Sequence, residues 1–277
     1  MLGAICGDII GSVFEIHNVK SEDFELFSRE SSFTDDSVLT VAVADALIFN
    51  NKPAKGYFRG LTRQREYAYR YKQYYSRYPY AGFGNMFKNW AAVNELNRQN
   101  SYANGAAMRV SPIGFAFDNI DDVIQEAVYS CKYTHNHKEA IQGAKAVAVS
   151  VFFARTGCSK EYIKKYIERY IKMDLSFTLD SIRKEYVFDS RASYSVPPAI
   201  VAFLESNSFE SAIRKAISIG GDSDTIACIT GGIAQAYYKT IPSYITNKCL
   251  SILDSGLKKT LYDFNKQFNI SYDEINQ

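Results

Sequence analysis

Three segments of this 277-residue chain are apolar on nearly every side and have helical rather than strand spacing. They cover residues 36–49, 139–154 and 224–238, and the last two are rich in Ala and Gly. A helix that is apolar all round has to be buried, and small residues let two helices approach closely. Strand signals are weak everywhere, the best being the short stretch Tyr186–Phe188. The sequence therefore predicts an all-α fold, a compact orthogonal helical domain with buried central helices.

Further helical segments have one apolar face and one face rich in Lys, Arg or Glu, namely 120–132, 159–172, 208–218 and 246–265. Pro is rare, with six in the chain, and no Gly/Ser linker, repeat or charge block divides the sequence. We therefore predict a single domain over residues 1–277. The Tyr-rich stretch 67–80 is interpreted as a solvated helix face with packed rings rather than a platform on which bases stack.

The charge balance excludes several classes of protein. With 32 Lys+Arg against 30 Asp+Glu, the net charge of +2 gives no electrostatic footprint for nucleic acid or a membrane surface. The longest uncharged apolar runs, 146–154 and 225–238, are shorter than the ~18–20 residues of a membrane span. Five scattered Cys without a C-x-x-C pair argue for a reducing compartment. We expect a cytoplasmic protein that is monomeric by default.

Acidic clusters stand directly before two of the apolar segments. Thr34, Asp35 and Asp36 precede the first, and the stretch Asp222–Thr225 opens the third. Each cluster alone is explained as a helix start, where Thr caps and Asp favours the positive end of the helix dipole. Four carboxylates near a protein core, however, are unfavourable unless they are neutralised. If the two helix starts meet, one or two divalent cations are the natural partners, since Mg²⁺, Mn²⁺ and Ca²⁺ prefer oxygen ligands.

Other motifs are weak when taken singly. Glycines at positions 3, 7 and 11 indicate a helix-packing groove that ends at Glu15, by itself a surface acid. Turn chemistry explains the Ser/Asn/Gly cluster of 101–109, and 81–84 is a weak candidate for a phosphate-binding loop. His135 and His137 form an H-x-H pair, but the absence of a nearby Cys and the total of three His argue against zinc.

Taken together, these motifs resemble the ADP-ribosylglycohydrolase family. The matching pieces run in the family's order and cover residues 3 to about 240: G-D-x-x-G-x-x-x-E at 7–15, T-D-D-S at 34–37, A-G-F-G at 81–84, S-Y-x-N-G-x-A-M-R at 101–109, T-H-N-H at 134–137 and G-D-S-D-T at 221–225. The paired T-D-D and D-x-D-T signatures are specific in this order, whereas the glycine motifs alone are not.

The resemblance implies an all-α domain around two divalent cations, Mg²⁺ or Mn²⁺. Matching positions would place as metal ligands Thr34, Asp35, Asp36, Asp222, Asp224 and Thr225. Glu15 matches a glutamate beside the metals that contributes to catalysis or gates substrate entry. The positions that match substrate-binding loops are Gly82, Phe83, Gly84, Ser101, Tyr102, Asn104, Gly105 and His135. Two positions depart from the family pattern, because Ala103 replaces a Gly and Phe83 stands where Tyr is common.

The implied activity is hydrolysis of the bond between C1″ of ADP-ribose and an acceptor, with Glu15, Asp35 or Asp36 as acid or base. The acceptor would be a protein side chain such as arginine or serine, or part of a small ADP-ribose derivative; a nucleic acid is not expected. Two other functions stay open. One is a catalytically silent relative that binds ADP-ribose or a protein partner, although none of the six metal ligands is lost. The other is a metal-dependent nucleotide phosphohydrolase, which a two-metal carboxylate site would suit equally.

Overall fold

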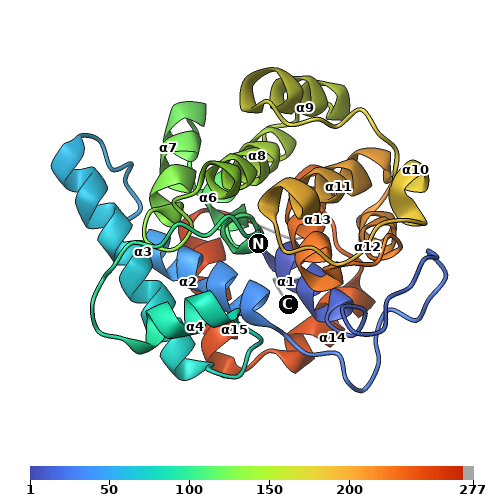
Figure 1. Cartoon of the computed structure of the whole chain (residues 1–277), viewed down its shortest axis with the longest axis horizontal. Coiled ribbons are helices and arrows are strands. Elements are labelled where there is room, and N and C mark those ends of the chain that lie inside the picture. The colour runs from blue at the N-terminus through green and yellow to red at the C-terminus, as the bar shows by residue number, and fades with distance from the viewer. Residues whose placement is uncertain (271–277) are drawn as a thin grey trace.

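The computed structural model describes residues 1–270, which fold into helices and connecting loops without a β-strand (Figure 1). Two isolated backbone bridges, Asn100–His135 and Ala103–Arg191, are the only β-type pairings within this range. The all-α prediction is confirmed. Tyr186–Phe188, the best strand candidate in the sequence, lies instead in an irregular segment. No helix of the described residues is long and apolar enough to cross a membrane.

The longest connections between successive helices are residues 12–34 and residues 93–104. In chain order the helices are α1 (Leu2–Gly11), α2 (Asp35–Phe49), α3 (Tyr57–Arg77), α4 (Asn85–Ala92), α5 (Gly105–Met108), α6 (Ser111–Ala116), α7 (Ile120–Cys131), α8 (Lys138–Arg155), α9 (Lys160–Tyr166), the π-helical turn η1 (Ile167–Ile171), α10 (Leu179–Arg183), α11 (Ala192–Glu205), α12 (Phe209–Ile217), α13 (Ser223–Tyr238), α14 (Ser243–Ile252) and α15 (Ser255–Gln267).

Helices α1 and α13 lie against each other at the centre of the molecule (Figure 1). Glycines make this contact possible, because a Cβ added to Gly7 would lie 2.0 Å from the Ala227 carbonyl oxygen. A Cβ on Gly231 of α13 would likewise lie 2.1 Å from the Gly3 oxygen. The backbones of the two helices therefore touch directly, and the packing groove expected from the glycine spacing is confirmed.

The three all-round apolar segments are the buried helices α2, α8 and α13, as predicted. The segment 246–265, expected as one helix, is instead split into α14 and α15 at Leu253 and Asp254. The Asp254 carboxylate accepts a hydrogen bond of 2.9 Å from the Leu257 amide and so starts a new helix. The apolar pattern continues across this break because Leu253 and Leu257 are both buried. In α3, Tyr67, Tyr71 and Tyr74 are buried, which confirms the packed rings predicted there.

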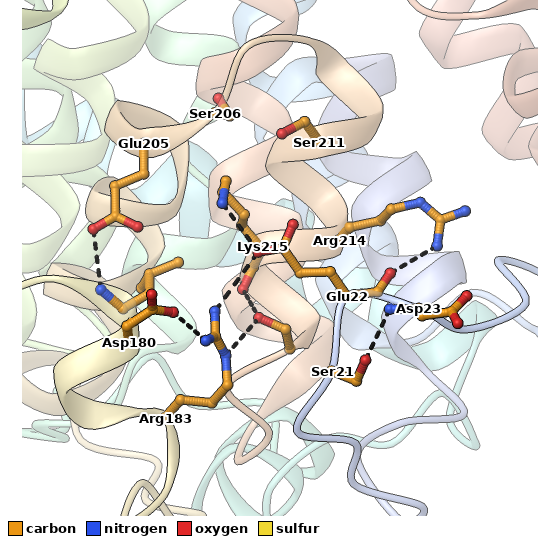
Figure 2. A network of polar contacts seen from close by, with 12 residues as sticks. Ser21, Glu22, Asp23, Asp180, Arg183, Glu205, Ser206, Ser211, Arg214 and Lys215 are labelled. Atoms are coloured by element: carbon orange, nitrogen blue, oxygen red, sulfur yellow. Dashed lines mark hydrogen bonds and ion pairs between the residues drawn. The ribbon is translucent and has the colours of Figure 1, made fainter.

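The long loop of residues 12–34 joins α1 to α2 and is fixed to the helices beside it (Figure 2). Glu22 accepts a hydrogen bond of 3.0 Å from Lys215 of α12, and its carboxylate also lies 3.7 Å from Arg183. Arg214 donates to the backbone carbonyl of Glu22 at 3.0 Å. These contacts hold a loop that carries Glu15, one of the predicted site residues.

Candidate metal centre and substrate cleft

The first turns of α2 and α13 meet beside α1 and bring carboxylates together. Asp8, Asp36 and Asp224 are buried, and one oxygen from each lies within 4.8 Å of the other two. Glu15, Asp222 and Asp224 form a second group of the same dimensions, so that Asp224 belongs to both. The two acidic helix starts, which the sequence could place together only conditionally, are therefore adjacent in the fold.

Asp8 is a member of this cluster that the sequence reasoning missed. Its carboxylate accepts hydrogen bonds from the backbone amides of Thr34 (2.9 Å) and Ser37 (3.0 Å). It also accepts from both of their hydroxyl groups, at 2.7 Å in the case of Thr34. Asp8 thus binds the first turn of α2 onto α1. The available signals were an acid within an otherwise apolar helix and its place in the G-D-x-x-G-x-x-x-E motif at 7–15.

Helix capping explains one of the two acidic starts but not the other. Thr34 is the N-cap of α2, and its hydroxyl accepts a hydrogen bond of 3.3 Å from the Asp36 amide. Asp222 stands at the N-cap of α13, yet its side chain makes no capping hydrogen bond. Instead its carboxylate accepts a hydrogen bond of 2.8 Å from the side-chain amide of Asn104. Asp222 is therefore oriented toward the cleft rather than toward its own helix.

The cluster is electrostatically unsatisfied within the described chain. Burial, followed by the nearby charges of Asp8 and Asp222, raises the pKa of Asp35 to about 8. Burial and neighbouring carboxylates also raise the pKa of Asp36 and of Asp224. None of these carboxylates forms an ion pair with a Lys, Arg or His of residues 1–270.

One atom tests whether cations fit here. Asp36 accepts a hydrogen bond of 3.2 Å from the Thr225 hydroxyl through Oδ2, whereas its buried Oδ1 has no hydrogen-bond partner. Buried polar atoms are nearly always satisfied, so this oxygen indicates a missing partner. The donors around it are carboxylate and hydroxyl oxygens, which is the ligand chemistry of Mg²⁺ and Mn²⁺. The site accordingly fits divalent cations.

The carboxylates line a cleft of about 400 Å³. Of the residues predicted to bind metal or substrate, all except Phe83 line it. Gly82 has a positive φ of 100°, and a Cβ there would lie 3.3 Å from Oδ1 of Asp35. The loop of residues 81–84 therefore lies directly against the acidic cluster.

Phe83 differs from the prediction in where its ring lies. The side chain is buried and stacks on Phe87 with ring centroids 5.1 Å apart, and it also contacts Tyr75 at 5.3 Å. The ring thus anchors the glycine loop to α3 and α4 instead of facing the cleft. Phe83, which replaces the Tyr common in the family, therefore does not line the cleft.

Asn104 and His135 are held in the cleft by their neighbours. Asn104 donates to Ser195 at 2.9 Å as well as to Asp222, which fixes its amide. The Nδ1 atom of His135 lies 2.8 Å from the Thr134 hydroxyl, to which the buried Arg109 also donates at 2.8 Å. Burial, and secondly the Arg109 charge, lower the pKa of His135, so the ring is neutral. Arg109 stands in the motif at 101–109, but nothing in the sequence indicated its contact with Thr134.

The H-x-H pair does not form a metal site in the described residues. His137 accepts a hydrogen bond from the Glu139 amide at the start of α8, and its ring lies edge-on to Tyr102. No His belongs to a group of possible metal ligands within residues 1–270. Cleft residues that the sequence did not indicate include Met86 and Phe188, both about half exposed, for which no spacing or motif gave a signal.

The all-α fold and this carboxylate cleft define a class of protein that the comparisons identify. The sequence model of ADP-ribosylglycohydrolase matches residues 1–273, and the chain belongs to this family. It is 28% identical to ADP-ribosylhydrolase ARH3 of Mus musculus over 86% of this chain and 82% of that protein. The human ARH3 is 27% identical over 86% and 84% of the two chains.

A more distant relative is the putative ADP-ribosyl glycohydrolase L543 of Acanthamoeba polyphaga mimivirus, which is 25% identical over 88% of this chain and 87% of that protein. Among solved structures, an ADP-ribosylglycohydrolase-related protein complex superposes with a TM-score of 0.67 at 21% identity. The superposition covers 98% of this chain and 97% of the other. At that identity the structural likeness supports the fold alone.

Proposed function

We propose that this protein hydrolyses the glycosidic bond at C1″ of ADP-ribose and releases ADP-ribose from an acceptor. The observation that carries the proposal is the meeting of the two acidic helix starts in one cleft, with a buried Asp36 oxygen left unpartnered. Family membership and the relatives named ADP-ribosylhydrolase support the same reaction.

The residues proposed to hold two divalent cations, Mg²⁺ or Mn²⁺, are Thr34, Asp35, Asp36, Asp222, Asp224 and Thr225, with Asp8 directly beside them. When bound, such cations would supply positive charge that polarises sugar hydroxyls and lowers the pKa of water. Because every proposed ligand is an oxygen, the donor set alone does not favour Mg²⁺ over Mn²⁺.

The remaining residues are proposed to orient the substrate and move protons. Asn104 and the neutral His135 are fixed donors or acceptors for the ribose, while the backbone of Gly82 and Gly84 gives the pyrophosphate close access. Glycosidic cleavage passes through an oxocarbenium-like state, which the carboxylates that line the cleft would stabilise. Glu15, Asp35 and Asp36 are the groups placed to take a proton from water or give one to the leaving acceptor.

The test is turnover of ADP-ribosyl-arginine, ADP-ribosyl-serine and O-acetyl-ADP-ribose by the full chain, with Mg²⁺ or Mn²⁺ and then with EDTA. We expect release of intact ADP-ribose that EDTA abolishes and that Asp35→Asn or Asp224→Asn reduces by at least about a hundredfold. Far-ultraviolet circular dichroism would establish that both variants stay folded.

The same assay separates the other functions. AMP or phosphate among the products would indicate phosphoester cleavage and contradict the proposal. ADP-ribose binding without turnover of any substrate would indicate a binding protein. Unchanged turnover in both Asn variants would exclude the carboxylate cluster as the reaction centre.

A further inference from the structure

A second cavity, of about 550 Å³, lies outside the cleft between α8, α10, α11 and the segment that follows η1. Its apolar lining consists of Met173, Phe177, Ile182, Tyr186, Tyr194, Pro197 and Pro198. Its charged lining residues are three acids, Glu139, Asp174 and Glu185, and one cation, Lys172. The cavity thus combines apolar walls with an excess of negative charge.

One chain segment, residues 185–194, separates this cavity from the cleft. Glu185, Tyr186, Ser193 and Tyr194 line the second cavity, whereas Phe188 and Ser190 line the cleft. The segment is also fixed to the cleft, since the Asn104 amide donates to the Ser190 carbonyl at 2.8 Å and the Ala192 amide to the Tyr102 carbonyl at 3.0 Å. A molecule bound in the cleft and one bound in the cavity would share this wall.

The Tyr186 ring brings the cavity close to the acidic cluster. A Cβ added to Gly221, which directly precedes Asp222, would lie 2.5 Å from this ring. Tyr186 also stacks on Tyr194 of α11 with ring centroids 4.6 Å apart. Tyr186 and Tyr194 therefore line the second cavity, and Tyr186 also contacts Gly221, the residue before Asp222 of the candidate metal centre.

The three acids keep their charge available. None of them has a Lys, Arg or His partner within 4.0 Å among residues 1–270. Hydrogen bonds from the side chain and backbone of Ser176 lower the pKa of Asp174. Glu139 accepts only a neutral donor, the Ser193 hydroxyl at 2.6 Å. Arg191, the nearby cation, is already paired with Asp189.

We propose that this cavity binds a basic and apolar peptide segment that flanks the modified residue of an ADP-ribosylated protein. The inference rests on the proposed function and adds to it a second contact surface for the modified protein, outside the cleft. An apolar side chain of the peptide would fill the lining, and a neighbouring Lys or Arg would face the carboxylates. The ADP-ribose on the same protein would occupy the cleft on the other side of residues 185–194.

The experiment compares two ADP-ribosylated peptides of equal length that carry the same modified residue, one flanked by Lys and Leu and one by Gly and Ser. The free ADP-ribosylated amino acid is the third substrate. We expect KM to be about fivefold lower for the basic peptide than for the neutral one, with similar kcat, because exposed charge pairs contribute modestly. Added 0.5 M NaCl should remove most of the difference.

The double variant Glu139→Gln/Asp174→Asn removes two charges and keeps both side-chain shapes and one acceptor oxygen on each residue. It should lose the preference for the basic peptide while retaining wild-type turnover of the free amino acid and wild-type affinity for ADP-ribose. The matched control, Glu30→Gln/Glu161→Gln, removes two exposed acids that line neither cavity and should keep the preference.

Equal KM values for the two peptides with the wild-type protein would overturn this inference and leave the glycohydrolase proposal intact. A preference that survives in the Glu139→Gln/Asp174→Asn variant would also overturn it, since another surface would then be responsible. No turnover of any of the three substrates would overturn the proposed function and, with it, the inference.

Discussion

The Asn18 side chain fixes the position of Glu15, which lies in a loop and belongs to no helix. Its amide donates to the carbonyls of Phe14 and Glu15 at 2.8 Å each, and its Oδ1 accepts from the Gly221 amide. Asn18 thereby links the backbone of Glu15 to the residue that precedes Asp222. Lys20 reinforces the link by donating to the carbonyls of Tyr186 and Ile219. Glu15 is exposed, yet its loop is held against the acidic cluster.

We expect Asn18→Ala to lower kcat about tenfold while leaving the Kd for ADP-ribose within about twofold, because a misplaced acid or base affects the reaction more than binding. If Asn18 acts through Glu15, Asn18→Ala should cause no further loss in a Glu15→Gln background. The control is Ser21→Ala, a substitution of an exposed residue in the same loop. Fully multiplicative losses in the double variant would show that the two residues act independently.

At the scale of single residues, the sequence predicted those acids of the cluster that a motif places at the start of a helix. The T-D-D and D-x-D-T stretches predicted metal ligands directly, since their carboxylates stand at the N-termini of α2 and α13. Asp8 and Asn18 could not be predicted in the same way. Their roles depend on contacts with Ser37 and Gly221, which are 29 and 203 positions away along the chain.

Among the elements, the α1–α13 pair places the acidic cluster. Gly11 of α1 lies against Asp224, because an added Cβ would be 2.6 Å from the Asp224 Cα atom. The same helix carries Asp8. The distance between the carboxylates of α1 and α13 is therefore set by direct backbone contact.

Gly7→Ala should lower the free energy of unfolding by about 3 kcal/mol or prevent folding, since the added methyl group would meet the Ala227 carbonyl at 2.0 Å. Urea unfolding followed by circular dichroism measures the change. Gly84→Ala is the control, because a Cβ there has no atom within 4 Å and its φ of −64° suits any residue. Similar stability of the two variants would contradict the close packing.

Sequence periodicity predicted the buried helices well but could not place every boundary. Residues 246–265 bury apolar side chains with one continuous helical spacing, and this spacing therefore gave no sign of the helix break at Asp254. An Asp can either face solvent within a helix or cap a new one. Only the approach of the Leu257 amide decides between these two outcomes.

For the whole molecule, the buried tyrosines of α3 predict a loss of stability in alkaline solution. Burial raises the pKa of Tyr74 to about 12 and raises those of Tyr67 and Tyr71 as well. Between pH 10 and 12 the unfolded chain loses phenolic protons that the folded chain keeps. The free energy of unfolding should therefore fall as pH rises, by up to about 1.4 kcal/mol per pH unit for each such group.

Urea unfolding of the wild type and of Tyr74→Phe at pH 9, 10 and 11 measures this dependence. The variant lacks one of the titrating groups, so its stability should decline less steeply above pH 10. Comparing the two proteins removes the contribution of every other group that titrates in this range. Parallel pH dependences would show that Tyr74 ionises equally in the folded and unfolded states.

Asp8, Asp36 and Asp224 come from three helices that are separated in the sequence and packed against one another in the fold. No local segment of the chain contains a complete set of these oxygens, so the set exists only after α1, α2 and α13 have docked. Any cation bound there is consequently linked to global folding rather than to the opening of a loop. We therefore expect chelation to accelerate amide hydrogen exchange throughout the central helices. The exchange rates of these core amides would then report whether the metal is bound.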